Sequence, residues 1–267
     1  MGELVFVGAG LHDEKGLSLR ALEEIRDAGT VFAEEYTAGL LPGWRERLAR
    51  LSGVPITPLT REEVEGETVI LQALERGRRV ALLVPGDPFA ATTHLALRLS
   101  AEQHGHHVRL VPGASIITAA PGMVGLFQYK FGRVVSLPYP LDPALYRPIS
   151  PYQALQANYA AGLHSLILLD LDPPLKRYLT ADVALRHLGR LEDELRGGIA
   201  SGDQEFCVVA RAGGPDAAVW VGSRMTLEKR DFGPPLHALL LPAPSPSRHF
   251  MEEEALASWR ARSGIKD

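Results

Sequence analysis

The chain has 267 residues, of which 46% are hydrophobic and 22% are charged, and its formal net charge is −4. This length suits two domains with buried cores, and the acidic balance lacks the basic footprint with which proteins bind a nucleic-acid backbone. No apolar run approaches the ~20 residues that cross a bilayer, no signal-peptide pattern opens the chain, and the single cysteine, Cys207, excludes an intrachain disulfide. We therefore expect a cytoplasmic protein that binds neither nucleic acid nor membrane.

Short apolar runs alternate with helix-like patterns along the first part of the chain. The run Val80–Val84 is continuously apolar, as in strands that are buried on both faces. Ser18 is expected to cap a helix, because its hydroxyl precedes an apolar stripe of helical period. Strands are predicted at residues 4–7, 30–33, 80–84 and 108–111, and helices after residue 18, over residues 62–76 and around residues 95–99. This alternation predicts a mostly parallel sheet covered by helices.

The pattern changes after Pro112-Gly113. Strand-like runs at 134–137, 166–171, 206–210, 218–221 and 236–241 lie between fewer helices, which favours a mixed sheet. A segment rich in proline and serine at 242–247 predicts a linker, and residues 251–262 predict a terminal helix. We therefore expect an α/β protein with an N-terminal domain at 1–112 and a C-terminal domain at 113–267.

Two rigid loops follow predicted strands. Gly8-Ala9-Gly10 begins like a dinucleotide fingerprint, but Asp13 stands where the third glycine is needed, so a phosphate cradle is excluded. Pro85-Gly86-Asp87-Pro88 lies at the carboxyl end of the most apolar strand, where open α/β sheets bind their ligands. Asp87 offers a carboxylate acceptor on this loop. For each loop the alternative is an ordinary turn without a functional role.

The remaining polar side chains provide few candidates for catalysis or metal binding. Ser115 lacks the following glycine of a hydrolase nucleophile motif, since Ile117 occupies that position, and is instead expected to cap a helix whose amides face a ligand. His104, His106 and His107 favour a solvated turn over a metal site, and no metal site is predicted. On local grounds His237 favours a structural role. No catalytic residue is identified, which favours a reaction catalysed by holding two reactants together.

Further short motifs run through nearly the whole chain. In order they are Gly8-Ala9-Gly10-Leu11, Phe32-Ala33-Glu34 with Tyr36-Thr37, Pro85-Gly86-Asp87-Pro88, Ala91-Thr92-Thr93-His94, Ala114-Ser115-Ile116, Tyr129-Lys130-Phe131-Gly132, Gly162-Leu163-His164, Leu169-Asp170, Ala210-Arg211-Ala212-Gly213, Asp231-Phe232-Gly233 with Pro235-Leu236-His237, and His249 with Met251-Glu252. Together they resemble the diphthine synthase family of the tetrapyrrole methylase superfamily. The chain departs from the family pattern at Ala9, Glu35 and Ala90. Residues 141–151 also match the family poorly, and this concerns the details of substrate binding more than cofactor binding.

The resemblance implies a two-domain, tetrapyrrole-methylase-like fold that forms a homodimer and binds S-adenosylmethionine in the cleft between its domains. It implies an enzyme that methylates the amino group of the 3-amino-3-carboxypropyl group on one histidine of translation elongation factor 2, during diphthamide biosynthesis. By position, the expected cofactor contacts are Leu11, Asp87, Ala90, Ser115, Ile116, Leu169, Ala212 and His237.

Two other functions stay open at this point. One is another methylase of the same fold, acting on a tetrapyrrole or on RNA. The other is a non-catalytic module that binds S-adenosylmethionine. The number of methyl groups transferred and the acceptor of the amine proton are not determined by the sequence.

Overall fold

The protein is described here by a computed structural model that covers residues 1–140, 147–173 and 175–263. The chain forms two compact units, Met1–Ile116 with Asp172–Leu175, and Ile117–Leu171 with Lys176–Asp267. Each unit is built on a five-stranded sheet. All strand pairs described in the first sheet are parallel, and the second sheet is mixed. The predicted α/β class, with a parallel and then a mixed sheet, is confirmed. Of the poorly matched stretch at 141–151, residues 141–146 lie outside the described residues.

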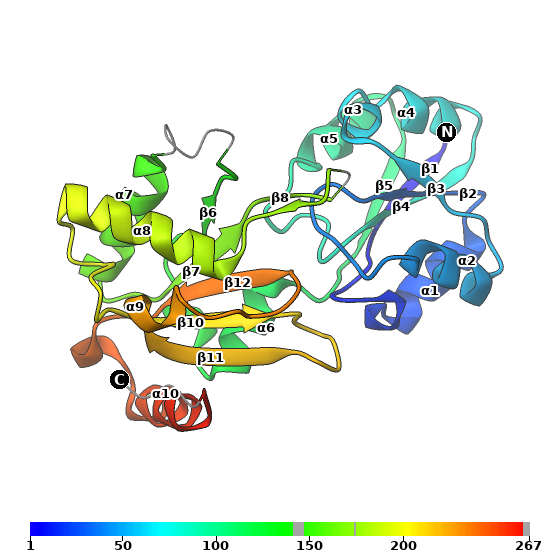
Figure 1. Cartoon of the computed structure of the whole chain (residues 1–267). Helices are drawn as coiled ribbons and strands as arrows, with labels where there is room; N and C mark the ends of the chain where they lie inside the picture. Colours follow the sequence, from blue (N-terminus) through cyan, green and yellow to red (C-terminus); the bar gives the residue numbers. More distant parts are fainter. Residues whose placement is uncertain (141–146, 174, 264–267) are drawn as a thin grey trace. The chain divides into compact units, whose positions relative to one another are not determined.

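The parallel sheet has the strand order β3-β2-β4-β1-β5 (Figure 1). Its central strands contain apolar and β-branched residues almost throughout, because helices cover both faces. The strands are β1 (Glu3–Gly8), β2 (Thr30–Glu34), β3 (Thr57–Leu59), β4 (Arg79–Val84) and β5 (His107–Val111). All but β3 are located where the sequence predicts a strand.

Side chains of β1 alternate between two cores. Leu4 and Phe6 pack with residues of α4 and α5, whereas Val5 and Val7 pack with residues of α1 and α2. Accordingly, α1 and α2 lie on one face of the sheet and α3, α4 and α5 on the other (Figure 1). The helices are η1 (Glu14–Gly16), α1 (Leu19–Asp27), α2 (Trp44–Ser52), α3 (Arg61–Glu65), α4 (Thr68–Glu75) and α5 (Leu95–Gln103). Ser18 caps α1 as predicted, since its Oγ accepts from the Ala21 amide at 3.1 Å.

The single helix predicted over residues 62–76 is wrong. Thr60 and Glu63 form a capping box that starts α3, and α3 ends after one turn at Gly66. Glu67 then takes a left-handed backbone, with φ of 60°, before α4 starts. A continuous helix cannot pass through such a residue.

The mixed sheet of the second unit has the order β11-β10-β12-β7-β6. Among the strand pairs that the structure describes in this sheet, only β6–β7 is parallel, and β12 runs antiparallel to both of its neighbours. The strands are β6 (Val135–Leu137), β7 (Ser165–Leu169), β10 (Glu205–Ala210), β11 (Ala218–Ser223) and β12 (His237–Leu241). Two short strands, β8 (Leu171–Asp172) and β9 (Arg177–Tyr178), form a separate two-stranded sheet. The strand predicted over 166–171 is therefore two strands separated by Asp170.

Helices α7 and α8 cover one face of this sheet and α10 lies at the other (Figure 1). The helices of this part are α6 (Ile116–Val124), η2 (Gln128–Lys130), α7 (Ile149–Ala160), α8 (Ala181–Leu195), α9 (Arg224–Leu227), η3 (Ser245–Ser247) and α10 (Phe250–Ser263). The terminal helix is located where it was predicted. The prediction of a linker at 242–247 is wrong, because Pro242 and Ala243 are buried and η3 follows them.

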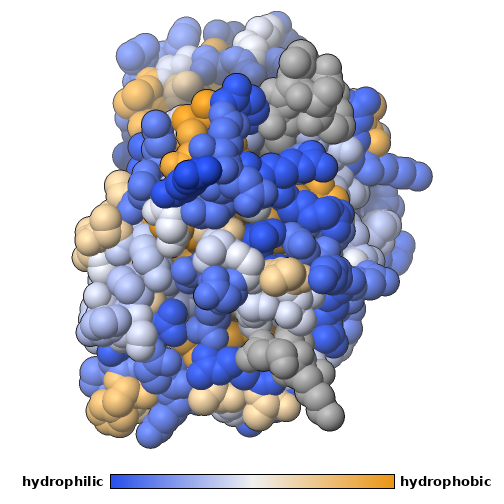
Figure 2. All heavy atoms as spheres, turned by 60° about the vertical axis from the view of Figure 1, so that its left-hand side comes forward, coloured by the Kyte–Doolittle hydropathy of each residue, from blue (hydrophilic) through white to orange (hydrophobic). Residues whose placement is uncertain are grey.

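Within the described part of the chain, no helix is long and apolar enough to span a membrane. Figure 2 shows a face on which hydrophilic residues predominate and apolar residues form scattered spots. Cys207 is fully buried in β10, and burial raises the pKa of its thiol. The buried thiol is therefore inert, since the thiolate is the reactive form of cysteine.

Candidate functional site

Three loops meet at the carboxyl edge of the parallel sheet. They follow β1, β4 and β5, which are adjacent in the order β4-β1-β5. The strand that follows β1 in sequence is β2, which lies on the far side of β4. The strand that follows β4 is β5, which lies on the far side of β1. Neighbouring strands that send their chains in opposite directions form a topological switch point, where open α/β sheets bind ligands.

The three loops touch through their backbones. Gly10 and Gly86 exchange two hydrogen bonds, of 3.3 Å from the Gly10 amide and 2.8 Å from the Gly86 amide. A Cβ atom at Gly113 would lie 2.1 Å from the Gly86 carbonyl oxygen, and one at Gly8 would lie 2.3 Å from the Gly113 nitrogen. Glycine at positions 8 and 113 is therefore required by backbone packing, which explains them without a phosphate ligand.

Asp87 joins the second loop to the third. Its Oδ2 accepts from the Gly113 amide at 3.1 Å, and its Oδ1 accepts from the Phe89 amide at 3.1 Å. The side chain is half-buried, so these charge-assisted bonds are partly shielded from water. Asp87 therefore holds the loops in one arrangement and still presents further acceptor sites on its carboxylate.

Replacing Gly113 with alanine is expected to lower the free energy of unfolding by about 1–3 kcal/mol, because the new methyl group forces two backbones apart. Gly122 is the matched control, since a Cβ there meets nothing within 4 Å and the residue lies inside α6. Urea unfolding of Gly113→Ala and Gly122→Ala measures the difference. Equal stability of the two variants would show that the loops are not packed as described.

Five of the predicted cofactor residues lie on these loops. Leu11 follows Gly10, and Ala90 follows Asp87 by three residues. Ser115 directly precedes α6, and Ile116 is the first residue of that helix. All five are partly exposed, and the topology brings them to one edge of one sheet.

The other three predicted residues lie together in the second unit. Because β12 is antiparallel to β7 and β10, its first residue lies beside their last ones. His237 pairs with Ala210, and Ala238 pairs with Leu168. Leu169 and Ala212 therefore flank His237 at one edge of the mixed sheet.

Both ring nitrogens of His237 form hydrogen bonds with backbone groups. Nδ1 accepts from the Ala181 amide at 3.3 Å, so the ring proton lies on Nε2 and is donated to the Pro234 carbonyl at 3.2 Å. Burial lowers the pKa of His237, which keeps the ring neutral. Arg211 secures the same loops by donating to the carbonyls of Phe232 and Pro234 at 2.8 and 3.0 Å. The local expectation of a structural role for His237 agrees with these bonds.

A buried polar cluster near the loop after β4 was not predicted from the sequence. Glu34 is fully buried at the end of β2, and His94 and Tyr36 are 2% and 6% exposed. The His94 Nδ1 lies 2.9 Å from the Pro88 carbonyl. The usable signal was an acidic residue directly after the apolar run that ends at Ala33, together with the Phe-Ala-Glu and Thr-Thr-His motifs.

The histidines at 104–107 do not form a metal site, and no cluster of three or more metal-ligating residues occurs among the residues that the structure covers. His104 and His107 are exposed. The prediction of a solvated turn is wrong for His106, which is buried and whose Nδ1 accepts from the Gly2 amide at 3.1 Å. Its position next to the amino end of β1 explains the burial.

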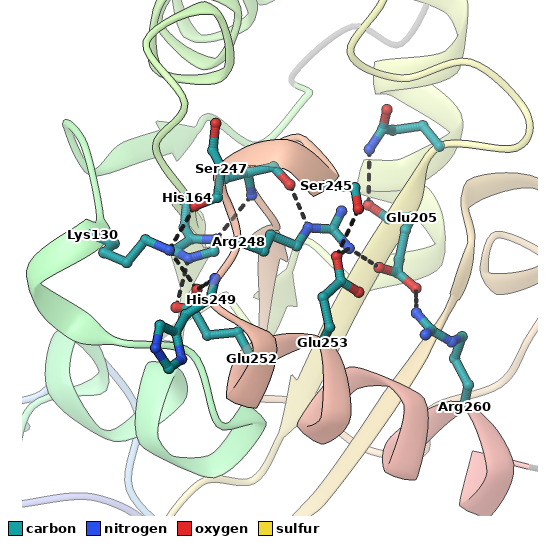
Figure 3. A network of polar contacts seen from close by, with 12 residues as sticks. Lys130, His164, Glu205, Ser245, Ser247, Arg248, His249, Glu252, Glu253 and Arg260 are labelled. Carbon is teal, nitrogen blue, oxygen red and sulfur yellow. Dashed lines mark hydrogen bonds and ion pairs between the residues drawn. The ribbon is translucent and has the colours of Figure 1, made fainter.

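The motifs around Lys130, His164 and Glu252 form a buried ionic network in the second unit (Figure 3). Glu252 is fully buried, and its carboxylate lies 2.6 Å from Lys130 Nζ and 3.0 Å from His164 Nε2. It also accepts from the amides of Phe127 and His249, each at 2.8 Å. Burial alone would raise the pKa of Glu252, but these bonds outweigh it and lower the pKa to about 2.

This network joins α10 to η2 and to the start of β7. His164 precedes β7 whereas Leu169 ends it, and the His164 Nδ1 accepts from the amide of Ala243, beyond the end of β12. The network therefore lies at the edge of the mixed sheet opposite to His237. These motifs stabilise the second unit and are not part of the candidate site.

Comparison with known proteins agrees with this architecture. Residues 3–228 match the family described as Tetrapyrrole (Corrin/Porphyrin) Methylases. The chain is 42% identical to a diphthine synthase of Methanothermobacter thermautotrophicus over 95% of this chain and 94% of that protein. It is 39% identical to one of Methanocella arvoryzae, over 95% and 96%. Its fold is similar to a crystal structure of diphthine synthase, with a TM-score of 0.86, 34% identity and coverage of 97% and 96%.

Proposed function

The chain belongs to the diphthine synthase family of tetrapyrrole methylases and is a methyltransferase, and on this basis we propose its cofactor and substrate. It uses S-adenosylmethionine to methylate the amino group of the 3-amino-3-carboxypropyl-histidine of translation elongation factor 2, in diphthamide biosynthesis. The observation that carries the proposal is similarity over 95% of the chain, rather than one shared motif. The proposal includes a cytoplasmic location and a homodimer, and the homodimer is proposed from the family resemblance.

The residues at the switch point fit this cofactor. S-adenosylmethionine carries no phosphate, so Asp13 in place of a third glycine is no obstacle. Gly86 is open on the side where a side chain would lie, since an added Cβ would have Ala114 O, at 4.0 Å, as its nearest contact. Leu11, Ala90 and Ile116 have no polar side chain, so any hydrogen bonds from these residues to the cofactor would come from their backbone groups. Asp87 supplies a carboxylate acceptor on a fixed loop.

When bound, the cofactor supplies a methyl group on a positively charged sulfur. The loops after β1, β4 and β5 would hold the cofactor, with Asp87 as a carboxylate acceptor on a loop fixed by its bonds to Gly113 and Phe89. The methyl group would pass to the neutral amine of the substrate, the carbon–sulfur electrons would stay on sulfur, and the amine proton would leave to solvent. Holding the amine nitrogen and the methyl carbon in line and roughly 3–3.5 Å apart would accelerate the transfer, because two reactants that are already oriented no longer have to meet in solution.

Transfer of radiolabelled methyl from S-adenosylmethionine to elongation factor 2 tests the proposal. We expect label on the factor that carries the aminocarboxypropyl histidine and none on the unmodified factor, with the number of methyl groups counted by mass spectrometry. Cofactor binding without label on the modified factor would overturn the substrate. Label on a tetrapyrrole or RNA would then favour another methylase, and no turnover at all would favour a binding module.

A further inference from the structure

A chain of hydrogen bonds connects the end of β2 to the loop that carries Asp87. It begins at Glu34, whose Oε2 accepts from the amides of Tyr36 and Thr37 at 2.8 and 3.0 Å, while its Oε1 accepts from the Thr37 hydroxyl. Burial raises the pKa of this carboxyl. The turn after β2 is folded around Glu34, and this places the Tyr36 ring in the interior, with 6% exposure.

Tyr36 and His94 are the next members. The Tyr36 hydroxyl lies 3.4 Å from His94 Nε2, and His94 Nδ1 lies 2.9 Å from the Pro88 carbonyl. A carbonyl only accepts, so Nδ1 carries a proton, and in the tautomer with the proton on Nδ1 the other nitrogen, Nε2, accepts from the Tyr36 hydroxyl. Burial and the nearby Glu34 charge raise the pKa of Tyr36, so the hydroxyl keeps the proton that it donates.

This series of hydrogen bonds ends at a peptide group next to Asp87. The Pro88 carbonyl accepts from His94 Nδ1 and also from Thr92 Oγ1, at 2.5 Å. The Asp87 carboxylate on the neighbouring residue is bonded to Gly113. The orientation of the loop is thus set from two sides, by Asp87 toward β5 and by His94 toward β2.

We propose that His94, with Tyr36 behind it, is a positioning residue for the cofactor-binding loop Pro85–Ala90. The inference rests on the proposed function, because it takes this loop to bind S-adenosylmethionine. His94 acts through the Pro88 carbonyl rather than by contact with the cofactor. Its hydrogen bond keeps the loop in the conformation that binds, so the protein does not have to order the loop when the cofactor arrives.

Two substitutions by amide side chains distinguish the contributions of the two ring nitrogens of His94. In His94→Asn the side-chain NH₂ takes the place of Nδ1 and keeps a donor for the Pro88 carbonyl. In His94→Gln the amide reaches the place of Nε2 and that donor is lost. The Kd of S-adenosylmethionine is measured by calorimetry on the whole protein, and KM and kcat are measured in the methyl-transfer assay. His104→Gln is the control, because His104 is exposed at the end of α5.

We expect His94→Gln to weaken cofactor binding about tenfold, which corresponds to one buried hydrogen bond, with KM for the cofactor raised and kcat changed less. His94→Asn should restore most of the affinity, and Tyr36→Phe should fall between wild type and His94→Gln. Equal affinities for the Asn and Gln variants, or a fall in kcat with unchanged KM and Kd, would overturn the positioning role while the proposed function stands. A wild-type protein that does not bind S-adenosylmethionine would overturn both.

Discussion

Replacing Asp87 with alanine is expected to weaken the binding of S-adenosylmethionine by about 10- to 100-fold. The substitution removes two charge-assisted hydrogen bonds, to the amides of Gly113 and Phe89, and bonds of this kind contribute about 1.5–3 kcal/mol each. It also removes the carboxylate that is proposed to accept from the cofactor. Isothermal titration calorimetry gives the affinity, and thermal unfolding shows whether the variant remains folded.

Two further variants give this experiment its controls. Asp87→Asn keeps the volume and one acceptor oxygen, so we expect an intermediate affinity. Asp27→Ala is the matched control, since Asp27 is 67% exposed and its carboxylate lies 3.7 Å from Arg79 at the opposite, amino edge of the same sheet. If Asp87→Ala binds the cofactor as tightly as Asp27→Ala does, the loop after β4 is not the cofactor site.

Replacing Glu252 with glutamine should lower the free energy of unfolding by about 3–5 kcal/mol, the usual result of breaking a buried ion pair by removing one partner. Glutamine keeps the shape but directs an NH₂ group toward donors, since Lys130, His164 and the amides of Phe127 and His249 all donate to this position. Urea unfolding at pH 7 measures the loss. Glu254→Gln is the control, because Glu254 is exposed on the same helix.

The stabilisation by Glu252 is also expected to depend on pH. Its pKa is about 2 in the folded protein and ordinarily 4.5, and a group whose pKa is lower in the folded state stabilises the protein above its unfolded pKa. That stabilisation is lost progressively as the pH falls from about 4.5 toward about 2. The stability difference between wild type and Glu252→Gln should therefore narrow by about 1 kcal/mol between pH 7 and pH 4. A constant difference over this range would contradict the ionised state of Glu252.

Local patterns were enough to identify most strands of both sheets. The apolar run at β4, the cap at Ser18 and the short runs after residue 134 are signals carried by neighbouring residues, and the elements form where those signals are. Position in a βα alternation also placed Asp87 at the carboxyl end of a strand, where open α/β sheets bind their ligands. Such features require only that each segment follow its own preference.

The predictions that failed depended on contacts between distant segments. Nothing local distinguishes the segment at 242–247 from a linker, yet the Ala243 amide bonds to His164, 79 residues away. His106 resembles its exposed neighbours in sequence, and only its contact with Gly2 buries it. The helix at 62–76 was interrupted by one left-handed residue, Glu67, whose backbone is not evident from its residue type.

The sequence by itself determined the α/β class, the order of the strands along the chain and the family. Only the tertiary structure decided that Asp87 bonds to Gly113, that glycine at 8 and 113 serves backbone packing, and that Glu252 holds Lys130 and His164. The physical reason is the separation along the sequence between the residues that interact. Periodicity and capping act within a few residues, whereas a buried carboxylate is stable only beside donors that the folded chain brings to it from elsewhere.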